Sequence, residues 1–72
     1  MIKILLNWGY VEFEKDNKGY MVFRNVDGEK KIYSLYVTDV THRSKIENSI
    51  TSESLVDINK RLEKTGVEIA EG

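Results

Sequence analysis

The 72-residue chain has no cysteine and no proline, and it has a single histidine. Without cysteine no disulfide can form and no thiolate can bind zinc. One histidine, His42, cannot build a metal site from several histidine ligands. The sequence therefore predicts neither a metal nor a cofactor. The fold must be held by its own core or completed by a second chain, so a monomer and a homodimer both stay open.

An excess of charge of one sign is also missing, and so is a long apolar run. Eleven Lys and Arg residues stand against twelve Asp and Glu residues, for a formal net charge of −1. Proteins that bind duplex DNA broadly have a clear basic excess, so this composition disfavours that class but leaves room for a local basic patch. No apolar stretch approaches the ~20 residues that span a bilayer, and no signal peptide is visible. We expect a cytoplasmic protein that does not enter a membrane.

The chain is short enough for one domain, residues 1–72, and no linker or repeat divides it. Three segments have the alternation and the β-branched and aromatic content of strands, at 10–14, 20–26 and 29–37. The turn-forming sequence KDNKG separates the first two, and Asp27-Gly28 separates the second and third. These signals predict an antiparallel β-meander. Residues 38–50 have no clear period, and either a fourth strand or an irregular loop fits them.

Residues 51–66 predict an α-helix with an apolar stripe of Leu55, Ile58 and Leu62. Thr51 or Ser52 can cap its start, and glycine at the end is typical of a C-terminal cap. Residues 67–72 fit a short final strand or a tail. At the N-terminus, a short helix ended by Gly9 is favoured over a strand in which Ile2, Ile4, Leu6 and Trp8 alternate. The predicted fold is α+β: a three- or four-stranded antiparallel meander with a C-terminal helix packed on one face.

The predicted turns also assign side chains to the two faces of the meander. An Asp27-Gly28 loop places Arg24 opposite Lys31, and a first turn centred on Asn17 places Phe13 opposite Met21. The core face, on which the helix is expected to pack, then carries Val11, Phe13, Met21, Phe23, Ile32 and Tyr36. The other face carries Tyr10, Glu12, Tyr20, Val22, Arg24, Lys31, Tyr33, Leu35 and Val37.

This second face predicts a binding surface, because Tyr and Arg are enriched where proteins meet their partners. The alternative is that the N-terminal segment and residues 38–50 cover it. The function expected is a small non-enzymatic binding or regulatory protein that acts on a protein partner, a type common among regulators and inhibitors of bacteria and their mobile elements. The residues predicted to bind are Tyr10, Tyr20, Arg24, Lys31 and Tyr33.

Binding of RNA or single-stranded nucleic acid is the second hypothesis. Aromatic side chains on a sheet can stack on bases, and Lys18 and Lys30, with Arg24 and Lys31, could contact phosphates. Enzymatic activity is not expected. His42 is the only side chain with an ordinary pKa near neutrality, and the sequence gives it no orienting partner beside Thr41 or Ser44.

Several short motifs resemble the HicA-type toxins, small ribonucleases with a double-stranded-RNA-binding-like fold. LLNWGY at 5–10 resembles the end of that family's first helix, and Lys18-Gly19 its Lys-Gly before the second strand. FRNVDG at 23–28 resembles the strand and turn that follow, and residues of the 51–66 segment resemble the last helix. The family's catalytic histidine follows its Lys-Gly closely, whereas Tyr20 and Met21 stand here. The resemblance therefore implies RNA binding or a recruited inhibitor, without ribonuclease activity.

Overall fold

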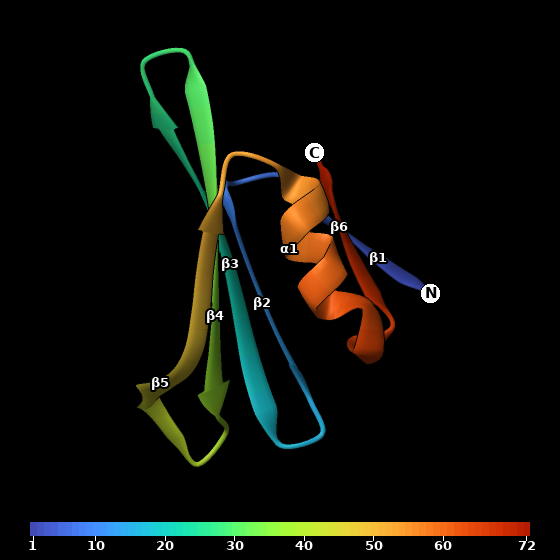
Figure 1. Cartoon of the computed structure of the whole chain (residues 1–72). Helices are drawn as coiled ribbons and strands as arrows, with labels where there is room; N and C mark the ends of the chain where they lie inside the picture. Colours follow the sequence, from blue (N-terminus) through green and yellow to red (C-terminus); the bar gives the residue numbers. More distant parts are fainter.

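A computed structural model describes residues 1–72, apart from the side chain of Arg43. Six strands and one α-helix follow one another along the chain (Figure 1), and a short 3₁₀ segment, η1, extends the helix. Their bounds are β1 Ile2–Leu6, β2 Tyr10–Lys15, β3 Lys18–Asp27, β4 Lys30–Asp39, β5 His42–Ser52, α1 Leu55–Leu62, η1 Glu63–Thr65 and β6 Val67–Glu71. The α+β prediction is thus confirmed for the fold class, and residues 38–50 contribute to a fourth meander strand.

The elements form two layers. Strands β2, β3, β4 and β5 make a four-stranded antiparallel sheet in that order, and β1 pairs in parallel with β6 in a separate two-stranded sheet. Helix α1 and the β1–β6 pair lie on the same side of the meander (Figure 1). The core fills the space between the layers, and its buried members are Leu6, Val22, Tyr33, Leu35, Ile58, Leu62, Val67 and Ile69.

The first hairpin turns on Asp16 and Asn17, which both have positive φ, at 52° and 65°. This is the pattern of a type I′ turn, whose twist suits a two-residue hairpin loop. Phe13 therefore lies opposite Tyr20, and not opposite Met21 as predicted. A one-residue difference in register exchanges the two faces of a strand relative to its neighbour. The predicted combination of Phe13 with Met21 on one face is wrong for this reason.

The second hairpin turns one residue later than predicted. Gly28, with φ of 64°, and Glu29 form the loop, and Asp27 lies opposite Lys30. Positive φ at the first central residue alone is typical of a type II′ turn, where glycine is favoured. Arg24 consequently pairs with Tyr33 and not with Lys31. The side chains of β3 and β4 are still grouped with the same neighbours as predicted, because the change in their register is an even number of residues.

The covered face of the meander is the one predicted to be free. Val22 and Leu35 lie opposite each other, at 0% and 1% exposure, in the centre of the core. Val11, Phe13, Tyr20, Val37 and Ile50 pack around them from the same side. The residues assigned to the core in β3 and β4, namely Met21, Phe23, Ile32 and Tyr36, lie on the opposite face. We call this uncovered side the outer face.

The N-terminal element and the start of the helix correct the sequence predictions, whereas β6 is the short final strand that was one of the two alternatives for residues 67–72. The N-terminal residues form a strand and not a helix, because pairing with β6 supplies the hydrogen bonds that a helix this short would have to make alone. The α-helix begins after its N-cap Ser54, whose hydroxyl accepts from the Val56 N–H. Thr51 and Ser52 do not cap the helix, since they belong to β5. Gly66 is the left-handed C-terminal cap, as predicted.

Candidate functional site

The structure does not bring the predicted binding residues together on one open surface. Tyr20, Arg24 and Tyr33 share the core-facing side of the meander, and Tyr33 is 6% exposed. Tyr10 pairs with Phe23 and lies on the outer face. Lys31 is exposed at the hairpin tip on the core-facing side, beyond the core. These side chains serve two different surfaces, because the true register of β2 differs from the predicted one.

Arg24 and Tyr33 bind the C-terminal strand of their own chain. The Arg24 guanidinium forms a hydrogen-bonded ion pair with the Glu71 carboxylate, and it donates to the Leu6 carbonyl at 3.1 Å. The Tyr33 hydroxyl donates to the other oxygen of Glu71. The Arg24 backbone N–H donates to the Gly9 carbonyl at 2.8 Å. This cluster of Arg24, Tyr33 and Glu71 therefore attaches the β1–β6 pair to the meander.

The cluster changes the acidities of its members in opposite directions. Burial, followed by the hydrogen bond to Glu71, raises the pKa of Tyr33. The hydrogen bond from Tyr33 and the ion pair with Arg24 lower the pKa of Glu71. Both shifts favour the neutral phenol donating to the charged carboxylate, so the arrangement is stable at neutral pH. Its role is structural, since every group in it faces another element of the same chain.

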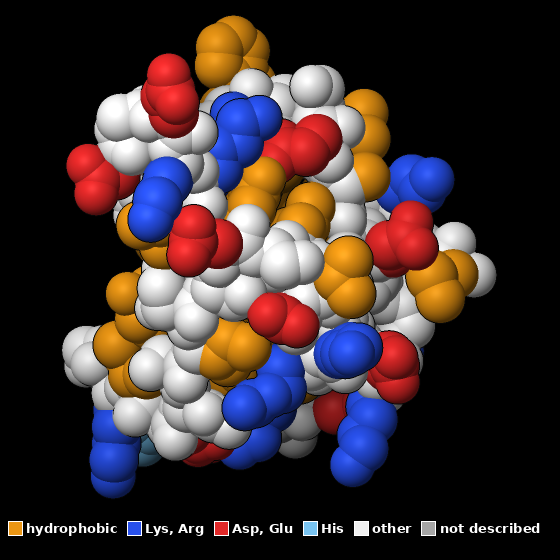
Figure 2. Space-filling view, turned by 45° about the horizontal axis from the view of Figure 1, so that its top comes forward, with side chains coloured by type: hydrophobic (Ala, Val, Ile, Leu, Met, Phe, Trp, Pro, Cys, Tyr) orange, Lys and Arg blue, Asp and Glu red, His pale blue; other side chains and the backbone are white. Residues whose placement is uncertain are grey.

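Most of the predicted phosphate contacts also have acidic partners within the chain. Lys18 forms a hydrogen-bonded ion pair with Glu47, which raises the pKa of Lys18. Lys30 lies 4.0 Å from Glu53, with both side chains largely exposed. Lys15, which was not among the predicted phosphate contacts, also has a partner within the chain, since its Nζ donates to the Thr65 carbonyl at 2.6 Å. In the view of Figure 2, side chains of both charge signs alternate over the surface, and hydrophobic side chains show between them.

A line of aromatic rings crosses the outer face from β2 to β4. The rings of Tyr10 and Phe23 lie opposite each other with centroids 4.8 Å apart, and Tyr36 meets Phe23 edge-on at 5.6 Å. Met21 and Ile32 extend the apolar surface along β3 and β4 by register. Offset and edge-to-face geometries are the preferred arrangements of aromatic pairs. The rings therefore form an ordered surface, and not a set of separate side chains.

This outer face lies outside the core. Tyr10 is 42% exposed, and Met21, Phe23, Ile32 and Tyr36 are partly exposed. None of these residues belongs to the buried core cluster or to the hydrophobic side chains packed against it. The acidic residues Glu12 and Glu14 share this face on β2. Ser34, which is 7% exposed, lies opposite Phe23 on this face, and Ser49 and Thr51 follow on β5. The outer face thus combines an aromatic centre with a polar border.

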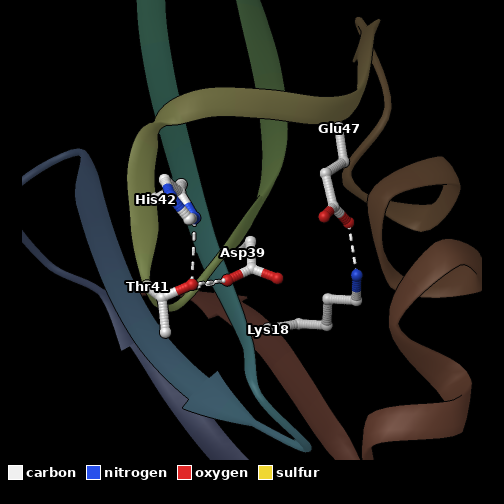
Figure 3. Close-up of polar contacts among 5 residues, drawn as sticks. All are labelled: Lys18, Asp39, Thr41, His42 and Glu47. Carbon is white, nitrogen blue, oxygen red and sulfur yellow. Dashed lines mark hydrogen bonds and ion pairs between the residues drawn. The ribbon is translucent and has the colours of Figure 1, made fainter.

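A second polar cluster lies at the turn between β4 and β5 (Figure 3). The Asp39 carboxylate accepts from the Thr41 N–H at 2.8 Å and from its hydroxyl at 2.5 Å, and these bonds lower the pKa of Asp39. The Thr41 hydroxyl also lies 3.0 Å from Nδ1 of His42. Asp39 and His42 both contact the hydroxyl, and they do not hydrogen-bond to each other. In a catalytic pair, the acid contacts the histidine base that it orients, and Asp39 does not contact His42 in this way. The hydrogen bonds of Asp39 and Thr41 instead close the turn between β4 and β5.

Two further observations concern metal ions and membranes. Among the described side chains, no group of three or more His, Asp or Glu residues is placed to hold a metal ion. Within the described residues, no helix is both long and apolar enough to cross a membrane. The outer face, which offers contact area and ring faces, is the strongest candidate for a functional site.

Comparisons of this chain with protein-family models, with curated proteins and with solved structures found no match. The resemblance to HicA-type toxins stays a prediction. Four residues of the outer face were predicted to lie in the core and were therefore missed as surface residues: Met21, Phe23, Ile32 and Tyr36. The Asp16-Asn17 pair was the signal that could have corrected this, because both residue types tolerate positive φ and together form a two-residue loop.

Proposed function

We propose that this chain is a small non-enzymatic binding protein that covers a surface on a protein partner with its outer face. The residues of the outer face that carry the proposal are Tyr10, Met21, Phe23, Ile32 and Tyr36. The observation behind it is the line of three rings on a sheet face that no other element covers. Tyrosine and other aromatic residues are enriched at protein interfaces, where they supply large contact areas with few rotatable bonds.

The chemistry of this face favours a protein partner over nucleic acid. Lys18 and Arg24, two of the cations predicted to meet phosphates, have carboxylate partners in their own chain. Glu12 and Glu14 add acidic groups to the side on which the rings lie. A polyanion would have to approach these carboxylates, whereas a partner with an apolar patch and basic groups at its edge would complement them.

The test is affinity capture from a lysate treated with nuclease, using the wild-type chain and two variants. Y10A combined with Y36A removes two of the three rings. V26A is the matched control, because Val26 is 68% exposed at the hairpin tip and lies on the other side of the sheet. We expect a protein that is retained by the wild type and by V26A and is lost with the double variant, with an affinity decrease of at least about tenfold.

Retention of the same partner by the Y10A/Y36A variant, when circular dichroism shows it to be folded, would contradict the proposal. Capture that disappears after nuclease treatment of the lysate would instead support the second hypothesis, in which the rings stack on bases. A titration of purified RNA at increasing salt then separates the two hypotheses, since phosphate contacts give a steep salt dependence.

A further inference from the structure

The two outer edges of the β1–β6 sheet differ in how they are protected. On the β6 side, the side-chain amide of Asn59 reaches across from α1. Its Nδ2 donates to the Ile69 carbonyl at 2.9 Å, and its Oδ1 accepts from the Ile69 N–H at 2.8 Å. These are the two hydrogen bonds that a neighbouring strand would make with this residue. Asn59 therefore closes the β6 edge, and a further strand cannot add there without displacing it.

Among the described side chains, none closes the β1 edge in this way. Strand β1 pairs with β6 as its neighbouring strand, and it lies on the outer side of the pair, away from the helix (Figure 1). The Ile2 N–H donates to the Gly66 carbonyl at 2.9 Å, so Ile2 points its backbone groups toward β6. Backbone groups alternate in direction along a strand of a parallel pair. Those of Lys3 and Leu5 therefore point outward, ready to pair with another strand.

Large apolar side chains are exposed along the same edge. Leu5 is 50% exposed, Ile2 is 65% exposed, and Trp8, just after β1, is 92% exposed. A tryptophan that becomes buried at an interface contributes ~150–250 Å² of contact, whereas a standard interface buries ~800 Å² per partner. Trp8, with Met1, Ile2 and Leu5, supplies a large part of that area. An open strand edge beside exposed apolar side chains is a typical site of strand addition.

We propose that β1 pairs antiparallel with β1 of a second copy of this chain, symmetrically about Ile4. In this register, Lys3 lies opposite the partner's Leu5, and the outward backbone groups of these two residues bond to each other. The two β1 strands are complementary in this register, because neither Lys3 lies opposite the other Lys3. Sliding the strands to place Lys3 opposite the partner's Lys3 would set like charges against each other, which destabilises a cross-strand pair. The two β1–β6 pairs then join into one continuous sheet.

The charges around the strand fit this arrangement. Lys3 lies 3.6 Å from Glu68 on β6, and both are on the outward side of the sheet. Leu5 stands beside Ala70 in the same layer. Each Lys3 is then flanked by Glu68 of its own chain and by an apolar residue of the other. This dimer uses β1 and Trp8, and so leaves the outer face of the meander open on both copies.

The proposed register can be tested with two matched variants at one exposed position. L5K and L5E both remove Leu5 and add one charge, so they affect the fold of the monomer similarly. L5K places a lysine opposite the partner's Lys3, and L5E places a carboxylate there. Analytical ultracentrifugation of the tag-free chain over a concentration series measures the dimer dissociation constant. We expect a wild-type dimer, retained by L5E and weakened at least about tenfold further by L5K than by L5E, since each pair occurs twice.

A wild-type chain that stays monomeric up to ~1 mM would overturn the proposal. It would also be overturned if L5K and L5E dimerised equally well, because another register or another surface would then form the contact. Y36A is the control on the outer face and is expected to keep the wild-type dissociation constant; a dimer lost with Y36A would place the interface on the meander instead. Binding of an added extended peptide at β1 of a monomeric wild-type chain would assign the edge to a different partner.

Discussion

The covered face of the meander carries more apolar side chains than the outer face, and it is the face that packs against a second layer. The covered face contains Val22 and Leu35, and it holds the β1–β6 pair through Arg24 and Tyr33. The outer face contains the Tyr10, Phe23 and Tyr36 rings, which pack on one another and on no second layer. The face with the larger apolar content is thus the one that the rest of the chain covers, in agreement with the favourable burial of apolar surface. The outer face keeps a smaller aromatic surface without a second layer.

The largest difference between the faces is expected in the free energy of unfolding. L35A removes a side chain that is 1% exposed in the centre of the core. Buried Leu→Ala changes cost ~2–5 kcal/mol, which is comparable to the whole stability of ~3–5 kcal/mol expected for a domain this small. We expect the variant to be largely unfolded at 25 °C by circular dichroism. A cooperative unfolding transition near that of the wild type would show that this face is not the core.

The next effect concerns the attachment of the C-terminal strand. R24M leaves the Glu71 carboxylate without its ion pair and the Leu6 carbonyl without its Arg24 donor. We expect a loss of ~1–3 kcal/mol in urea denaturation, the usual range for hydrogen bonds to charged groups. K30M is the matched control, because Lys30 has only an exposed partner 4.0 Å away, and it should cost less than ~0.5 kcal/mol. Equal effects of the two substitutions would contradict the structural role given to Arg24.

These positions show what the sequence could and could not provide. Strand content, the two hairpins, the apolar helix stripe and the Gly66 cap follow from local signals and were predicted. The assignment of faces depended on one residue in the first turn, and the Asp16-Asn17 loop made it wrong for β3 and β4. Pairing of β1 with β6 joins the two ends of the chain, so no local pattern could reveal it. Arg24 and Tyr33, which were predicted to bind a partner, contact Glu71 of the chain's own C-terminal strand.

A smaller effect is expected in the pH dependence of stability. The pKa of Glu71 is lowered in the folded state, so its contribution is present above its unfolded pKa of ~4.3 and is lost as the pH falls through the folded value. E71Q should therefore lose less stability than the wild type between ~pH 7 and ~pH 3, by no more than ~1 kcal/mol, because the carboxylate is partly exposed and screened. Urea denaturation at both pH values measures this difference. Parallel acid profiles of the two proteins would exclude Glu71 as a contributor.

The last comparison concerns the two tyrosines of β4, one on each face of the meander. Y36A removes a partly exposed ring that meets Phe23 edge-on, so we expect a loss of at most ~1.5 kcal/mol in thermal or urea unfolding. Y33A removes the other tyrosine of β4, which is buried and hydrogen-bonded to Glu71. We expect it to lower the free energy of unfolding by ~3 kcal/mol or more. The pair compares the same chemical change on the two faces of one strand. Equal losses would mean that the outer face is also part of a packed core.

The most direct test of the central claim is the affinity of a captured protein partner for the folded Y10A/Y36A variant, measured by titration calorimetry against the wild type and V26A. Binding through the outer face predicts an affinity at least about tenfold lower for the double variant and unchanged for V26A. An unchanged affinity of the double variant would contradict the claim and move the binding site away from the outer face of the meander.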